Sequence, residues 1–246
     1  MKLIITTIWS FIATLLCFYA WYNLHVYGLL KFKLQVQFFT KWSFAIETIY
    51  FLTSTLKQLY VLIFDRKKGI RQSKFFALLF SLAASCTTIA GIMFWVLAIT
   101  NRKLLENTAI IPNQPPIFVH HLFHTMSLIL WIIELIILPN IIRTIPSNFL
   151  VLGSIFIVAL SYGSQSKYTQ LTTGGSAYPF LDKFSLVQWI IFFAITTIVG
   201  FVLQKFVLWI ISLRIPKGVN EAKKSNPQKN KQANLKKKNS RARKID

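Results

Sequence analysis

The chain has 246 residues, of which 54% are hydrophobic and 15% aromatic, yet its formal net charge is +21. Only 14% of its residues are charged, against roughly 25% in soluble domains. This balance excludes a disordered chain, and one soluble core of this size would not bury so much apolar surface. Two cysteines, Cys17 and Cys86, are too few for a disulfide scaffold. The composition therefore predicts an all-α polytopic membrane protein with a basic appendage.

Six apolar runs have about the length that a helix needs to cross a bilayer, roughly 20 residues. They cover approximately residues 3–22, 44–64, 75–99, 117–138, 149–162 and 186–213, and the fifth is the shortest. The first run follows a Lys, as in a signal peptide, but aromatic rather than small residues come after it, so we expect it to remain as a span. The sequence predicts about six transmembrane helices within residues 1–213.

The remaining segment, residues 214–246, is strongly basic. It holds twelve Lys and Arg against two acids, Glu221 and Asp246, which gives +10. Because it has no periodic apolar residues, we expect it to be disordered. Next to membrane spans, such a tail favours a topogenic signal or contact with anionic lipid headgroups. Nucleic-acid binding is disfavoured, since no aromatic residues are interleaved with the charges.

The same tail decides the predicted orientation and location. The short loops carry seven Lys and Arg on each side of the membrane, so the basic tail breaks the tie and both termini are expected in the cytoplasm. The last four residues, Arg-Lys-Ile-Asp, approximate a retrieval signal for the endoplasmic reticulum. We therefore expect a multi-pass protein of the endoplasmic reticulum membrane.

Three of the four histidines, His120, His121 and His124, lie near the start of the fourth run. On a helix they occupy neighbouring faces. Ionisable groups inside a membrane are costly and often functional. Three interpretations stay open: a metal site, which would need more ligands than this chain offers; interfacial histidines satisfied by water and headgroups; and a general base.

A general base requires a nucleophile at the same depth, and Thr48 is the candidate. Because successive spans cross the membrane in opposite directions, the second, fourth and sixth runs begin on the side where the first, third and fifth runs end. Thr48 lies about one turn into the second run and His124 about two turns into the fourth. Asn101 and Arg102, which follow the third run, and Tyr178, which precedes the sixth, are expected on that side too.

Several short motifs follow one another between about Trp42 and Leu203. They are Trp42-x-Phe44-x-x-x-Thr48 with Asp65, Phe94-Trp95 with Asn101-Arg102, His121-x-x-His124-Thr125 with Glu134, Gly174-x-x-x-Tyr178-Pro179, and Lys183-x-Ser185. In their order and spacing the chain resembles the androgen-induced protein family, multispanning membrane threonine hydrolases that cleave fatty acid esters of hydroxy fatty acids. The resemblance implies a lipid ester substrate, Thr48 as nucleophile, His124 as its base, and no metal or other cofactor.

The chemistry is sound on physical grounds. A threonine hydroxyl is a weak nucleophile until an adjacent base takes its proton, and an imidazole would do this and later protonate the leaving alcohol. The supporting residues are His121 and three candidates for oxyanion stabilisation, Asn101, Arg102 and Tyr178.

Alternatives to this site stay open. A threonine in a membrane helix often bonds only its own backbone or a neighbouring helix. Thr53 and Thr55 in the same run are alternatives to Thr48. No third catalytic member is evident: Glu47 precedes Thr48, but adjacent helix positions point about 100° apart, so Glu47 need not face His124.

Charges inside the predicted spans suggest other functions. Lys57, Glu134 and Lys205 would each cost about 2.5–3.5 kcal/mol at the centre of a span, so partners are expected. We predict an ion pair between Lys57 and Glu134 that joins the second and fourth spans. A small transporter or channel that uses these charges, and a non-catalytic scaffold that recruits partners through the tail, are the alternatives to a hydrolase.

Overall fold

The computed structural model describes residues 2–27, 38–64, 73–101, 116–137, 145–176 and 178–214. The chain divides into two units, residues 1–211 and 212–246. The second unit lies almost entirely outside the described residues, and so does the predicted basic tail. The architecture below is that of the first unit.

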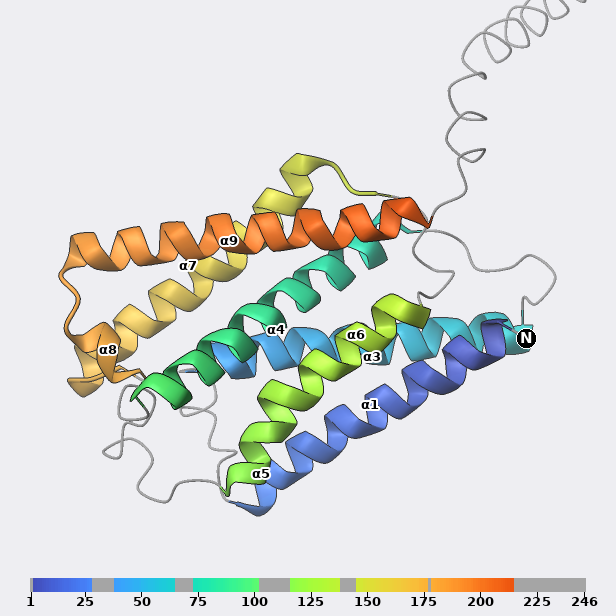
Figure 1. Cartoon of the computed structure of the whole chain (residues 1–246), viewed down its shortest axis with the longest axis horizontal. Helices are drawn as coiled ribbons and strands as arrows, with labels where there is room; N and C mark the ends of the chain where they lie inside the picture. The colour runs from blue at the N-terminus through green and yellow to red at the C-terminus, as the bar shows by residue number, and fades with distance from the viewer. Residues whose placement is uncertain are drawn as a thin grey trace, which may run out of the picture. The chain divides into compact units, whose positions relative to one another are not determined.

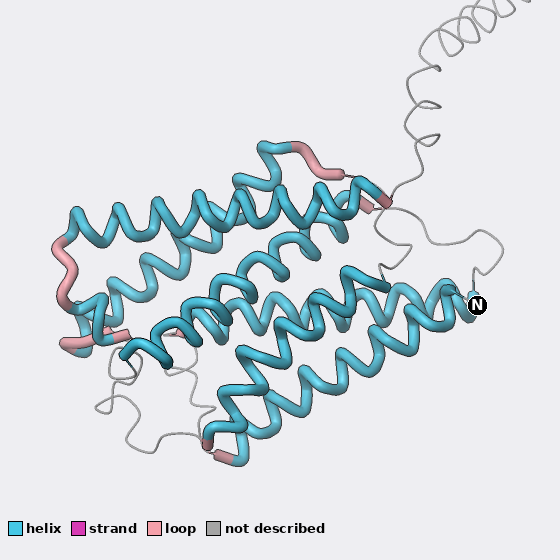
Figure 2. Tube along the Cα trace, in the orientation of Figure 1, coloured by secondary structure: helices cyan, strands magenta, loops and turns pink. Residues whose placement is uncertain are grey.

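The described residues are almost entirely helical, with no strand among them (Figures 1 and 2). In chain order these are α1 (Lys2–Val26), α3 (Phe39–Phe64), α4 (Lys74–Asn101), α5 (Ile117–His120), η2 (His121–Met126), α6 (Ser127–Ile137), α7 (Asn148–Thr173), α8 (Pro179–Asp182) and α9 (Leu186–Leu213). The segments α5, η2 and α6 continue directly into one another, so they form one helix with a π-helical turn inside it.

Five helices among the described residues are long and apolar enough to cross a membrane. They are Leu3–Val26, Lys74–Asn101, Ile117–Ile137, Asn148–Thr173 and Leu186–Leu213. Helix α3 has 26 residues, which is also the length of a span, but it is more polar. Its polar side chains are largely buried: Thr40, Ser43, Glu47, Thr48, Ser54, Thr55 and Gln58. The fold is therefore all-α with about six transmembrane helices, as predicted.

Helix α7 is longer than predicted. We expected the fifth span to end at Tyr162 and a loop to follow, whereas the helix continues to Thr173. The hydroxyls of Thr172 and Thr173 donate to carbonyls one turn earlier, which is compatible with helix. The end comes at Gly174, whose φ of 77° is left-handed and whose N–H donates to the Gln170 carbonyl. The prediction failed because hydropathy shows where a helix becomes polar, not where it stops.

The helices pack through small residues. Helix α3 contacts α1 and α4, and α4 contacts η2, α6 and α7. Helix α9 lies against α7: a Cβ built on Gly200 would be 2.7 Å from Cγ1 of Ile155, and one on Gly163 would be 3.2 Å from the ring of Trp189. Such close approaches are typical of membrane helices, which associate by packing rather than by the hydrophobic effect.

The outward faces of the helices are apolar. Exposed large side chains recur along α1, α7 and α9, for example Phe11, Leu15, Ile157, Leu160, Ile191 and Ile198. Contiguous apolar surface on this scale is unfavourable in water and normal in lipid. Polar groups are instead buried between the helices, where hydrogen bonds satisfy most of them.

Candidate active site

The π-helical turn η2 places His124 in the interior. Turns of this kind occur frequently at functional sites. The His124 side chain is 5% exposed, and its Nδ1 has no hydrogen-bond partner. Leaving a buried polar atom unpaired costs about 1–3 kcal/mol, so this nitrogen is a candidate for chemistry. No three His, Cys, Asp or Glu side chains among the described residues lie close enough together to hold a metal ion.

The His124 ring is stacked on Phe94 of α4. Their ring centroids are 3.7 Å apart and their planes differ by 5°. His120 lies near the same phenyl ring, with a centroid distance of 5.1 Å. The close approach of α4 depends on Gly91, where a Cβ would be 3.1 Å from the carbonyl oxygen of His124. Packing against α4 thus orients the imidazole while its Nδ1 stays unpaired.

Thr48 lies on α3 and its hydroxyl is bonded toward α1. The hydroxyl donates to the Phe44 carbonyl at 2.8 Å and accepts from Nε1 of Trp21 at 3.0 Å. Both Thr48 and His124 are described, and no hydrogen bond joins them. They lie on α3 and η2, which contact each other. Both candidates are therefore buried on neighbouring helices, but the Thr48 hydroxyl is hydrogen-bonded to Trp21 of α1 and not to His124.

Aromatic rings occupy the space beside the two candidates. Phe44 of α3 and Phe123 of η2 are in edge contact, with centroids 4.5 Å apart. The Trp21 ring lies 5.5 Å from Phe44 and 6.3 Å from Phe123. The ammonium of Lys41 is 3.3 Å from the centroid of Phe123, a cation–π geometry. This cluster connects α1, α3 and η2 at the level of His124.

The two alternative threonines are bonded in ways that need no catalytic role. Thr53 donates to the Ile49 carbonyl at 2.6 Å. The Thr55 hydroxyl is 3.0 Å from that of Thr14 on α1. Both are typical of threonines in membrane helices.

Three predicted supporting residues lie at the surface or beyond the described part of the chain. His121 is exposed, with its Nδ1 3.1 Å from the Thr125 hydroxyl and its ring 5.0 Å from that of Trp95. Asn101 is the exposed last residue of α4. Arg102 lies outside the described residues.

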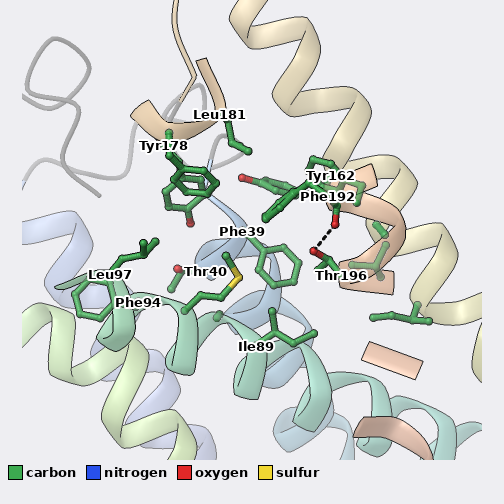
Figure 3. Close-up of a pocket in the computed structure, with 17 residues that line it drawn as sticks. Phe39, Thr40, Ile89, Phe94, Leu97, Tyr162, Tyr178, Leu181, Phe192 and Thr196 are labelled. Carbon is green, nitrogen blue, oxygen red and sulfur yellow. Dashed lines mark hydrogen bonds between the residues drawn. The ribbon is translucent and has the colours of Figure 1, made fainter. Parts of the chain in front are cut away.

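Tyr178, the fourth supporting residue, directly precedes α8 and faces the start of α3. The backbone N–H and the hydroxyl of Ser176 both donate to Oδ1 of Asp182 at 2.7 Å, which ties the loop to α8. The Tyr178 hydroxyl points toward Thr40 at the start of α3 (Figure 3). Burial raises the pKa of the Tyr178 phenol, so it stays neutral and keeps its proton for donation.

An apolar pocket lies between α4, α7 and α9 (Figure 3). It encloses about 730 Å³, part of it open to the exterior, and residues of α3 and α8 complete its wall. Phe94 and Ala90 line it, and both also contact His124: Phe94 through the ring stack and Ala90 through its backbone. His124 and the pocket thus share Phe94 as a common wall.

Glu47, which is fully buried, turns away from Thr48. Its Oε2 accepts from the Thr87 hydroxyl of α4 at 3.3 Å, and Ser127 of α6 faces the same carboxyl group. Its Oε1 has no partner within hydrogen-bond geometry. Glu47 therefore joins α3 to α4 and α6.

The predicted ion pair between Lys57 and Glu134 is wrong. Glu134 accepts from the Tyr50 hydroxyl and from Nε1 of Trp9, both at 2.6 Å. The Lys57 ammonium lies 4.1 Å from the centroid of the Phe76 ring on α4. The prediction failed because matching depth does not fix which way a side chain points, and neutral donors from α1 and α3 already hold both carboxylate oxygens.

Three residues that shape this region were not found by sequence analysis. Trp21 and Thr40 belong to no motif that carries a known role, and Phe94 was part of a motif without an assigned function. The one sequence feature that could have identified them is an alternation of polar and aromatic residues on the interior faces of the helices. This feature can be recognised only when it is known which face of each helix points inward.

Apolar helices of spanning length around a buried polar interior define a polytopic helical membrane protein. The chain matches the model of the FAR-17a/AIG1-like protein family over residues 1–212, so it belongs to this family. The resemblance found in the sequence motifs is thereby confirmed. The chain is similar to the human androgen-dependent TFPI-regulating protein, with 25% identity over 165 residues that cover 65% of this chain and 68% of that protein. No solved structure matches it.

Proposed function

We propose that this protein hydrolyses lipid esters within the membrane, with Thr48 as nucleophile and His124 as base. Fatty acid esters of hydroxy fatty acids are the substrates that the sequence resemblance implies. The observation that carries the proposal is the buried Nδ1 of His124, which has no partner and lies inside a multispanning domain. An unpaired imidazole nitrogen in this position is available to accept a proton, which supports the proposal.

The reaction would proceed in two steps. In the first, the Thr48 oxygen attacks the ester carbonyl carbon while His124 takes the hydroxyl proton, and the leaving alcohol receives that proton from His124. The fatty acyl group is then esterified to Thr48. In the second step, water attacks this ester and gives a proton to His124, which returns it to the Thr48 oxygen as the fatty acid leaves.

For the attack, the Thr48 hydroxyl must leave the Phe44 carbonyl to which it now donates. Rotation about the Cα–Cβ bond of Thr48 moves this hydroxyl without moving α3. The indole N–H of Trp21 donates to the Thr48 oxygen and would stabilise negative charge that develops on it. Trp21 is thus a positioning residue in this scheme.

The proposal includes a location and partners. The proposed location is the endoplasmic reticulum membrane with both termini in the cytoplasm, an orientation that the positive charge of residues 214–246 supports. The same charge supports contact between the tail and anionic lipid headgroups. The tail would then anchor and orient the protein and take no part in hydrolysis.

The test is hydrolysis by the purified full chain in lipid nanodiscs, with fatty acid esters of hydroxy fatty acids as substrates. Thr48→Val keeps the side-chain shape without the hydroxyl, and His124→Gln removes the base; each should lower kcat by roughly a hundredfold or more. Thr53→Val is the matched control on the same helix and should retain activity. Wild-type protein should also react with a fluorophosphonate probe, and Thr48→Val should not.

Full activity of Thr48→Val would reject Thr48 as the nucleophile, and loss of activity in Thr53→Val alone would transfer the role to Thr53. Absence of hydrolysis by wild-type protein across ester classes, together with loss of cellular function on removal of residues 214–246, would favour the scaffold interpretation instead.

A further inference from the structure

The pocket beside His124 is elongated along the helices. On α4 its lining runs from Ile89 to Leu97, which are separated by about 12 Å along the helix. On α7 it runs from Ile155 to Tyr162. Its two ends are therefore distinct. One lies near Tyr178 and Leu97 at the ends of the helices, and the other lies deeper, between Ile89 and Ile155.

The polar groups of the lining are unevenly placed. Four lining residues carry hydroxyls, and that of Thr196 donates to the Phe192 carbonyl at 2.8 Å. Tyr162 has bonding partners of its own. Thr40 and Tyr178 meet at the outer end, where both side chains appear in Figure 3. Apart from Thr196, whose hydroxyl is bonded within its own helix, the deep half is lined by aliphatic and aromatic side chains, so the pocket is an apolar tube with its available hydroxyls at the outer end.

This shape and polarity fit a single acyl chain that carries an oxygen-bearing end group. Pockets for small ligands typically combine an apolar wall with a few placed polar groups, and this pocket does the same, with Thr40 and Tyr178 as the polar groups of an otherwise apolar lining. An end group near Tyr178 and Thr40 would lie on the same side of the pocket as Phe94, the residue stacked on His124.

The deep end of the pocket is closed by Ile155, whose position depends on Gly200. Ile155 is 3% exposed and lines the pocket. A Cβ on Gly200 would be 2.7 Å from Cγ1 and 2.9 Å from Cδ1 of Ile155, and 3.5 Å from Cδ1 of Ile89. The missing side chain at residue 200 therefore leaves room for Ile155 to pack between α7 and α9 at the deep end of the pocket.

We infer that this pocket binds the acyl chain of the lipid substrate, with its oxygen-bearing end at Tyr178 and Thr40, and that Ile155 seated on Gly200 sets the longest chain that fits. That the lipid is a substrate rests on the proposed function, whereas binding of its acyl chain in the pocket does not require hydrolysis. Phe94 then forms the wall between the bound chain and His124.

The experiment is photolabelling of the full chain in nanodiscs of fixed phospholipid composition. The probes are diazirine-bearing fatty acids of 8, 12, 16 and 20 carbons, and labelled residues are located by mass spectrometry. We expect labels on α4, α7 and α9 at lining residues, and competition by unlabelled fatty acid.

Substitutions of pocket residues show where the acyl chain binds, because they change which probe lengths label the protein. Thr196→Phe fills the deep half and should lower labelling by the 16-carbon probe roughly tenfold, in the range that overpacking of a filled site produces, while the 8-carbon probe still labels. Ile155→Ala should extend the accepted length toward the 20-carbon probe. Ile195→Phe is the matched control, because Ile195 is the neighbouring residue and is exposed on the outer face of α9.

Equal effects of Thr196→Phe and Ile195→Phe, or labels confined to outer faces, would overturn the pocket assignment. Labelling that phospholipid displaces and fatty acid does not would assign the pocket to a bilayer lipid, which also overturns it. The measurement is repeated on Thr48→Val. Pocket labelling in a wild-type protein that hydrolyses no ester would reject the proposed function and retain the acyl-chain site, so the two failures are distinguishable.

Discussion

Phe94 and His124 lie face to face, with their ring centroids 3.7 Å apart. This contact restrains the plane of the imidazole, and Nδ1 of His124 stays unpaired in its buried position. Because Phe94 also lines the apolar pocket, a ligand in the pocket would contact the same ring that packs against His124. A change at residue 94 should therefore affect catalysis before it affects folding.

Phe94→Leu tests the contact between Phe94 and His124. Leucine keeps an apolar side chain but removes the flat surface that orients His124, and misplacement of a catalytic group by about 1 Å can cost about a hundredfold in rate. We expect kcat for ester hydrolysis to fall at least roughly tenfold, with a small change in thermal stability. Phe75→Leu, the same exchange at an exposed position of α4, is the control. Equal kcat values in the two variants would contradict a role for this contact.

Trp21→Phe tests the bond between the Trp21 indole and the Thr48 hydroxyl. The exchange keeps an aromatic ring and removes the N–H that donates at 3.0 Å. We expect kcat to fall roughly tenfold, less than when an oxyanion-hole donor is removed. The loss of stability should be about 0.6 kcal/mol and no more than about 1.7 kcal/mol, as for other hydrogen bonds between membrane helices.

Trp9 provides the matched control for Trp21. It lies on the same helix and donates its indole N–H to Glu134 at 2.6 Å, away from the candidate site. Trp9→Phe should lower the thermal unfolding temperature in detergent and leave kcat per folded molecule unchanged. If Trp9→Phe and Trp21→Phe reduce kcat equally, the Trp21 bond has no special role.

The carboxylate of Glu134 should be more important for stability than the ammonium of Lys57. Glu134→Leu leaves the Tyr50 hydroxyl and the Trp9 indole without their acceptor, at about 1–3 kcal/mol for each buried group. Lys57→Met removes a cation that lies over the Phe76 ring, so we expect a loss of at most about 1 kcal/mol. Thermal unfolding of the two variants checks this order. Equal destabilisation would indicate that the two charges interact after all.

The sequence predicted the helices well because their cause is local. A run of apolar residues long enough to cross a bilayer must satisfy its own backbone, and a helix does so within the run. The end of α7 at Thr173 was missed because a polar helix turn and a polar loop have similar composition. Gly174, whose left-handed φ ends that helix, was the usable signal in the sequence.

The candidate site could be predicted only in part, because its contacts are between helices. Residue types and depth favoured Thr48 and His124, and the structure buries both. Depth does not determine the rotation of a helix about its axis, so the bond from Trp21 to Thr48 and the stack of Phe94 on His124 were not predictable. The same ambiguity produced the wrong ion pair between Lys57 and Glu134.

Gly91→Ala tests whether the close approach of α4 to η2 positions the site. A Cβ there would be 2.9 Å from Cδ1 of Leu128, a side-chain end that can shift, and 3.1 Å from the carbonyl oxygen of His124, which is backbone. Because backbone in a helix yields only by moving the helix, we expect a destabilisation of about 1–3 kcal/mol.

Gly153→Ala is the matched control for Gly91→Ala, since a Cβ on Gly153 meets nothing within 4 Å and the residue lies inside α7. That change should raise stability by up to about 1 kcal/mol through helix propensity alone. If both exchanges stabilise the protein equally, α4 and η2 are not in close contact at Gly91. If Gly91→Ala lowers stability but leaves ester hydrolysis per folded molecule unchanged, the packing of α4 holds the fold together without setting the position of His124.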